Sequence, residues 1–186
     1  MKIFSLLCRT NSLEQQCAEI RPKLYRTAYA WCHNKTLADD LVQEALTKGM
    51  RSLKQLKDPA QFNSWLFTIM TNCWRDHFRQ QREMDDIATM DESLYADRIT
   101  PEDNHTQSQI VRQVRDAVAQ LPMGQRQVVT LVDLAEFSYA EVAEILAIPI
   151  GTVMSRLCRA RSSLQSLLKQ HQPEMSLKYS RLRSIK

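Results

Sequence analysis

Glycine is scarce in this sequence, which has only three among 186 residues. Tight β-hairpins and phosphate-binding loops depend on glycine, so its scarcity favours an all-α fold. No apolar run approaches the roughly 20 residues that a membrane-spanning helix needs. The apolar stretch between Lys2 and Arg9 is too short for the core of a signal peptide. We therefore expect a helical, cytoplasmic protein.

The sequence also lacks the residue groups of a metal or catalytic site. Its five cysteines include no pair spaced Cys-x-x-Cys, and neither Cys73 with His77 nor Cys32 with His33 offers enough ligands for zinc. No Ser/His/Asp set or glycine-rich phosphate loop is recognisable either. These absences predict buried structural thiols, no metal, no cofactor and no enzymatic activity.

Charge is unevenly distributed along the chain. Hydrophobic residues make up 44% of it, enough for packed cores, and the net charge is +4. Residues 83–107 hold eight acids, one base and Pro101, a composition typical of a linker, with a short helix over 90–98 as an alternative. The pattern predicts two small helical domains over 12–82 and 108–170, joined by this acidic flexible linker and followed by a basic tail over 171–186.

In the first domain, the spacing of apolar residues predicts three long helices. The first runs over 13–33 and is broken or restarted at Pro22. The second begins after Thr36 as N-cap and continues to about Leu56. The third covers residues 62–82.

Two faces of this domain are candidates for binding. The start of the second helix carries an acidic patch, which either stabilises the positive end of the helix dipole or docks a basic partner. It consists of Asp39, Asp40, Gln43 and Glu44. The third helix mixes aromatic, amide and basic side chains, a combination that suits unstacked bases, although a partly buried aromatic core is the alternative. Those residues are Trp65, Asn72, Trp74, Arg75, His77 and Arg79.

The clearest motif lies in the second domain, between Ser138 and Arg161. Apolar spacing predicts one helix up to Leu146, a break at Pro149, and a second helix from Gly151. This is the layout of a helix-turn-helix, whose second helix enters the major groove of DNA. The inward positions of that helix leave Thr152, Ser155, Arg156, Arg159 and Arg161 for solvent or DNA.

The charge around this motif favours DNA over an ordinary two-helix hairpin with a solvated basic face. From Ile145 to the end there are eight Lys or Arg and one acid, Glu174. Such a basic surface attracts phosphates. We expect Arg156, which lies nearer the start of the helix, to read a base, and Arg159 to hold a phosphate.

Three segments together resemble a known family. They are ADDLVQEAL, FNSWLFTIMTNCWRDHFR and LPMGQRQVVTLVDLAEFSYAEVAEILAIPIGTVMSRLCRAR, in this order. The chain resembles the bacterial RNA polymerase sigma factors of the extracytoplasmic-function type, which have two domains. The resemblance implies binding to core RNA polymerase and to promoter DNA, and a cognate anti-sigma factor as a further partner.

The resemblance also implies roles for individual positions. The acidic patch would dock on core polymerase. A pocket for a flipped-out base of the −10 element would include Ser52, Leu56, Ile69 and Asn72. The −35 element would be read by Thr152, Ser155, Arg156 and Arg159. Three positions depart from the family's usual pattern, namely Met154, Cys158 and Ala147, and they bear on −35 preference.

Two other functions compete with this one. A stand-alone helix-turn-helix regulator would bind duplex DNA without joining polymerase, but it leaves the acidic patch and the third helix unexplained. A sigma-mimicking interaction protein would sequester another regulator and start no transcription.

Overall fold

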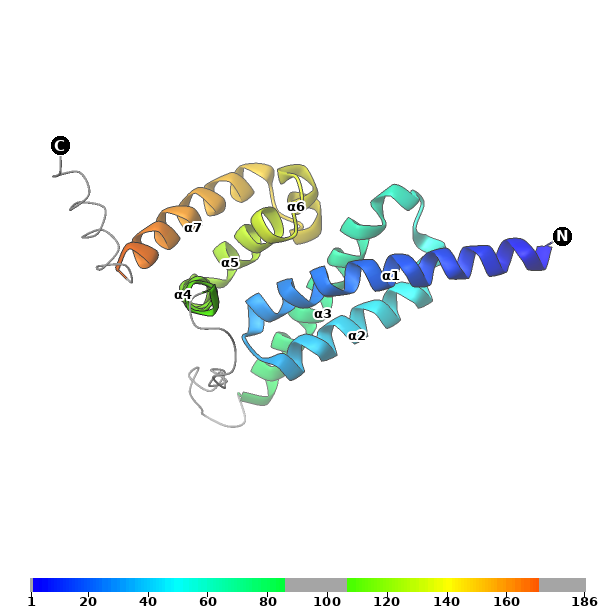
Figure 1. Ribbon diagram of the computed structural model, residues 1–186, viewed down its shortest axis with the longest axis horizontal. Coiled ribbons are helices and arrows are strands. Elements are labelled where there is room, and N and C mark those ends of the chain that lie inside the picture. Colours follow the sequence, from blue (N-terminus) through cyan, green and yellow to red (C-terminus); the bar gives the residue numbers. More distant parts are fainter. Residues whose placement is uncertain (1, 86–106, 171–186) are drawn as a thin grey trace.

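The computed structural model describes residues 2–85 and 107–170, and within these ranges every regular element is helical (Figure 1). The all-α prediction is thereby confirmed. The predicted acidic linker lies mainly outside the described residues, and the alternative helix over 90–98 and the basic tail lie wholly outside them. None of the described helices is both long enough and apolar enough to cross a bilayer.

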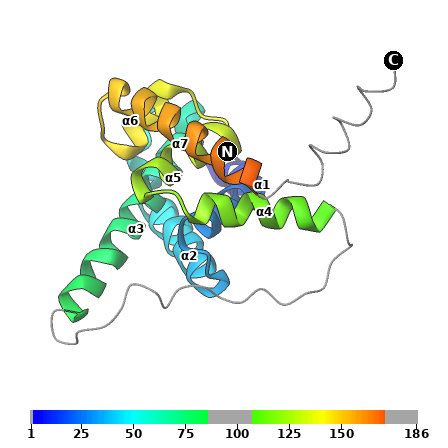
Figure 2. The same cartoon turned by 90° about the vertical axis from the view of Figure 1, so that its left-hand side faces the viewer.

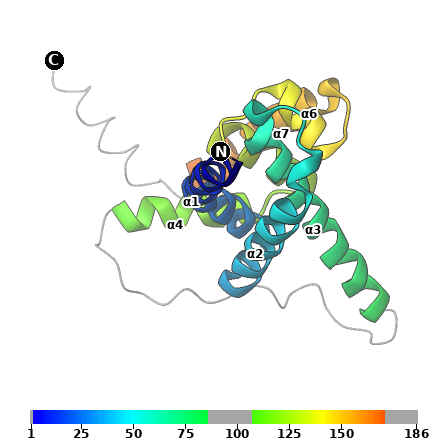
Figure 3. The same ribbon diagram turned by 90° about the vertical axis from the view of Figure 1, so that its right-hand side faces the viewer.

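The first part of the chain forms three long helices: α1 (Lys2–Cys32), α2 (Lys35–Ser52) and α3 (Phe62–Asp85). Two short 3₁₀ turns, η1 (Leu53–Gln55) and η2 (Pro59–Gln61), connect α2 to α3. The largest fully buried side chains of this part come from all three helices and include Leu24, Leu41, Phe67 and Met70. Figures 2 and 3 show the C-terminal end of α3 extending beyond the other helices.

The prediction that Pro22 breaks the first helix is wrong, because α1 continues through it without interruption. Proline removes the N–H that would bond to the carbonyl of Ala18, four residues earlier. Both residues are exposed, so water can satisfy that carbonyl and the helix has no buried unpaired group at this point.

The start of α2 also differs from prediction, since its N-cap is Asn34 and not Thr36. The Asn34 side chain accepts a hydrogen bond from the Leu37 N–H at 3.0 Å. His33, immediately before it, adopts a left-handed backbone conformation with φ of 52°. The chain therefore turns sharply between α1 and α2 and starts the new helix two residues earlier than expected.

The second part of the chain contains α4 (Gln107–Ala119), α5 (Met123–Val129), the π-helical turn η3 (Thr130–Leu134), α6 (Tyr139–Leu146) and α7 (Ile150–Gln170). The last two form the predicted helix-turn-helix. Ser138 and Glu141 cap α6 reciprocally, and Ala147 ends it with φ of 52°. Val142, Ile145 and Val153 are buried between α6, α7 and α5.

The two parts pack directly against each other, which the sequence did not predict. Trp31, at the end of α1, is 1% exposed, and its indole N–H donates to the Thr130 hydroxyl at 2.8 Å. Phe67 of α3 and Phe137 meet edge to face with ring centroids 4.8 Å apart. Helix α4 lies across the C-terminal end of α1 (Figure 2). The two predicted domains thus share one continuous core.

Arg126 connects the ends of two helices at this interface. Its guanidinium donates to the carbonyl of Trp31 at 2.8 Å and to those of Ala119 and Leu121 at the end of α4. Helix C-termini leave carbonyls without intrahelical partners, so the positively charged guanidinium, with its several N–H donors, is well placed here. Burial, together with the Arg126 charge, lowers the pKa of neighbouring His33 to about 4.

Ala147 generates the first prediction. A left-handed conformation costs a residue with a Cβ about 1–2 kcal/mol and costs glycine almost nothing. We expect Ala147→Gly to raise the free energy of unfolding in urea by about 1 kcal/mol. Ala140→Gly, inside α6, is the matched control and should lower it. Destabilisation by Ala147→Gly would contradict this account of the turn.

His33 generates a prediction about pH. Because its folded-state pKa lies below 6.5, the unfolded chain binds the proton more tightly and stability rises with pH between about 4 and 6.5. After discounting for partial exposure, we expect about 1–2 kcal/mol from this residue. His33→Asn tolerates the same backbone conformation and should remove that part of the slope. Parallel pH profiles of unfolding for the two proteins would refute the prediction.

Candidate nucleic-acid interface

Helix α7 presents a polar face on the side away from its core contacts. Val153, Leu157 and Ala160 are at most 3% exposed, and Ser155 and Arg159 are exposed on the opposite side. The Arg159 guanidinium donates to the Ser155 carbonyl at 3.2 Å and to its hydroxyl at 3.4 Å. The predicted arrangement of this helix, with one buried and one open face, is therefore present.

Arg156 does not extend into solvent as expected. It is half-buried, and its guanidinium lies against α5, 3.1 Å from the place where a Cβ on Gly124 would be. Thr152 is likewise half-buried, at the start of the helix. The four predicted −35 residues thus share one face of the helix, because they follow the spacing i, i+3, i+4 and i+7, and Ser155 and Arg159 are the most open of them.

Most of the predicted −10 residues follow one another along α3. Trp65 and Ile69 are half-buried against α2 near Gly49, where a Cβ would meet them at 3.8 and 3.9 Å. Asn72 shares this helix face with Trp65 and Ile69, because the three are spaced i, i+4 and i+7. Its side chain is exposed. Ser52 and Leu56 are half-buried at the end of α2 and just beyond it. The alternative of a buried aromatic core holds for Trp74, which is 5% exposed.

One −10 candidate, Arg75, contacts the helix-turn-helix. The guanidinium of Arg75 donates to the carbonyl of Leu146, the last residue of α6, and to the Asn72 amide oxygen at 3.3 Å. Arg79, further along α3, pairs with Asp76 at 3.5 Å and is exposed. The face expected to meet the −10 element is therefore partly engaged within the chain itself.

The acidic patch lies on the exposed side of α2. Asp39, Asp40, Gln43 and Glu44 are all exposed, whereas Leu41 and Ala45 on the other side are buried. Asp39 is 3.9 Å from Arg21, and Glu44 pairs with Lys48 at 2.8 Å. This ion pair raises the pKa of Lys48.

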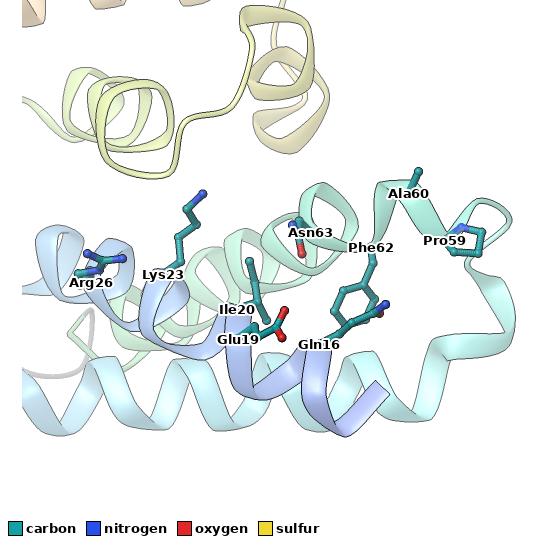
Figure 4. Close-up of a pocket in the computed structure, with 9 residues that line it drawn as sticks. All are labelled: Gln16, Glu19, Ile20, Lys23, Arg26, Pro59, Ala60, Phe62 and Asn63. Atoms are coloured by element: carbon teal, nitrogen blue, oxygen red, sulfur yellow. The ribbon is translucent and has the colours of Figure 1, made fainter. Parts of the chain in front are cut away.

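An open groove of about 360 Å³ runs between α1 and the start of α3 (Figure 4). Glu19, Ile20 and Lys23 line it from α1, and Phe62 and Asn63 from α3. Lys23 also pairs with Glu136 of the second part at 3.3 Å. The groove adjoins the loop before α3 but contains none of the predicted site residues.

The sequence predicts buried cysteines, but not all of the described cysteines are buried. Cys32 and Cys73 are 7% and 1% exposed, and burial raises their pKa. Cys17 is half-buried, and Cys158 is exposed on α7. The expectation is wrong for Cys158, which lies one turn from Met154.

Comparison with known families matches both parts of the chain. Sigma-70 region 2 matches residues 18–84, and Sigma-70 region 4 matches residues 111–164. These two ranges contain α2, all but the last residue of α3, α6, most of α7 and every predicted site residue.

Individual relatives agree with the family match. The ECF RNA polymerase sigma factor EcfG of Rhodopseudomonas palustris is 33% identical over 160 residues, covering 86% of either chain. SigW of Bacillus subtilis is 30% identical over 158 residues, covering 80% of this chain and 84% of that protein. Sigma factor RpoE from Bartonella quintana, solved with the anti-sigma factor NepR, superposes with a TM-score of 0.71 at 27% identity, covering 85% of this chain and 97% of that one.

A region 2 domain followed by a region 4 domain with a helix-turn-helix defines a sigma factor, the subunit that gives RNA polymerase its choice of promoter. The chain belongs to the ECF group of RNA polymerase sigma factors. It binds core RNA polymerase and promoter DNA and directs the initiation of transcription.

Proposed function

We propose that three helices of this sigma factor carry out three separate steps of initiation. The acidic patch of α2 docks on core polymerase, α3 captures the melted −10 element, and α7 reads the −35 element in duplex DNA. The observation that supports this division is that the exposed members of the three sets lie on three different helices, on sides away from the buried residues. One protein can then hold polymerase and both promoter elements at once.

We further propose a cytoplasmic initiation factor with no enzymatic activity of its own. RNA synthesis takes place in the core polymerase, so the sigma factor needs binding surfaces and not catalytic groups. The Bartonella relative binds an anti-sigma factor, and by analogy we propose that an anti-sigma factor holds this protein inactive. The two rival functions remain outcomes of the transcription assay below.

The first test is run-off transcription with purified core polymerase. We expect promoter-specific transcripts with the parent chain and none with Asp40→Arg/Glu44→Arg, because positive charges would face a basic partner and weaken core binding by several kcal/mol. A chain that binds promoter duplex but supports no transcription would be a stand-alone regulator. A chain that supports no transcription and binds no promoter would be a sigma mimic.

The control for charge alone is Glu19→Arg/Glu144→Arg, which reverses two exposed acids outside the acidic patch. Retention of core polymerase on an affinity column separates the two double variants. The docking assignment fails if the patch variant retains polymerase as well as the control does.

The second test concerns the two arginines of α7. Because Arg159 is open and Arg156 lies against α5, we now propose the reverse of the sequence-based assignment, with Arg159 at a base and Arg156 at a phosphate. Arg159→Ala should cost about 1–3 kcal/mol at one base pair and relax preference there. Arg156→Ala should weaken binding to all −35 sequences evenly. It should also reduce the slope of log affinity against log salt concentration by about one. Binding to a −35 panel at two salt concentrations distinguishes these patterns, and an exchanged result would restore the original assignment.

A further inference from the structure

A row of apolar side chains lies exposed along α7. Ile150 and Met154 are 50% and 54% exposed, and Cys158 follows one turn later, also exposed. Residues four apart stack along one helix face, so the three form a continuous strip. This strip is distinct from the buried face that includes Val153 and Leu157.

No other described helix covers this strip. Helix α7 packs on α4, α5 and α6 and lies on the side of α5 away from α1 (Figure 1). Large exposed apolar side chains gathered in one place usually mark a binding surface. The strip begins at the first turn of the second helix of a helix-turn-helix, the part that meets base edges.

The charge of α7 indicates what the strip binds. The helix carries three arginines and one lysine but no Asp or Glu along residues 150–170. Ser155 and Arg159, both exposed, lie beside the strip and can reach polar groups or phosphates. A surface that combines a cationic helix with an apolar strip complements the major groove better than it complements a neutral protein partner.

Only one of the four DNA bases places a methyl group in the major groove. Thymine presents its C5 methyl group there, whereas guanine, adenine and cytosine present donors and acceptors. The Met154 thioether has no donor and is a weak acceptor, so it cannot replace an arginine at guanine. Its flexible and polarisable side chain can, however, pack against a methyl group.

We propose that Met154, flanked by Ile150 and Cys158, reads thymine methyl groups in the −35 element. The proposal rests on the proposed function of α7 as the reader of duplex −35 DNA. It assigns a role in sequence specificity to Met154, whose side chain carries no charge and so makes no ionic contact with DNA. It requires at least one thymine in the preferred −35 sequence, on either strand.

Deoxyuridine tests the proposal, because it differs from thymidine only by the missing C5 methyl group. Holoenzyme made with the full chain would first select its preferred −35 duplex from a randomised library. Each thymine of that duplex would then be replaced singly by deoxyuridine. For one or two positions we expect affinity to fall about fourfold, as follows from about 0.8 kcal/mol for one buried methyl-sized group.

Two variants decide whether Met154 is responsible. Met154→Gln keeps the length of the side chain at an exposed position and should bind thymine and deoxyuridine duplexes equally. Met50→Gln changes a methionine that is 65% exposed on α2, and it should keep the fourfold difference. Loss of the difference in both variants would overturn the assignment to Met154.

The remaining outcomes are also informative. Holoenzyme that selects no −35 sequence would contradict the proposed function of α7 itself. Sequence-selective holoenzyme that is indifferent to every methyl group overturns the inference alone. If it is indifferent and Met154→Gln also abolishes binding of a purified anti-sigma factor, the strip is a protein-docking surface and not a base reader.

Discussion

One half-buried cation, Arg126, joins the two halves of this sigma factor. Arg126 donates to the Trp31 carbonyl at the end of α1 and to the Ala119 and Leu121 carbonyls at the end of α4. The Trp31 and Ala119 carbonyls lie in the last turns of their helices and have no partner there, and the Leu121 carbonyl lies just beyond α4. Leaving a carbonyl buried and unpaired would cost about 1–3 kcal/mol. The Trp31–Thr130 hydrogen bond and the Phe67–Phe137 contact add to an interface that Arg126 organises.

Much of the fold could be predicted from the sequence because it depends on local signals. Apolar spacing located the three long helices of the first part and the two helices of the helix-turn-helix, and Pro149 with Ser138 marked the limits of α6. It assigned no helix to α4, α5 or η3. The failures arose where a local signal depends on its surroundings. Pro22 was expected to break a helix but lies on an exposed side of α1, which continues through it. Asn34 and not Thr36 caps α2, because the chain turns at His33.

The candidate site was predictable in its parts and not in its arrangement. The acidic patch lies on the open side of α2, as its spacing indicated. Apolar spacing alone could not show that the Arg156 guanidinium turns back onto Gly124, because that contact joins residues 32 positions apart in the sequence. The same holds for the interface between the two domains, which depends on matching surfaces and not on periodicity.

The contact between Arg75 and the end of α6 has a consequence for when this protein is competent to open DNA. The guanidinium already has a carbonyl acceptor, so a nucleic-acid strand must displace the Leu146 carbonyl before that N–H can reach a phosphate. Meanwhile α7 keeps its outer face open in the same arrangement. Under the roles proposed for α3 and α7, this arrangement leaves the outer face of α7 open to duplex DNA while an N–H of Arg75 is engaged within the chain.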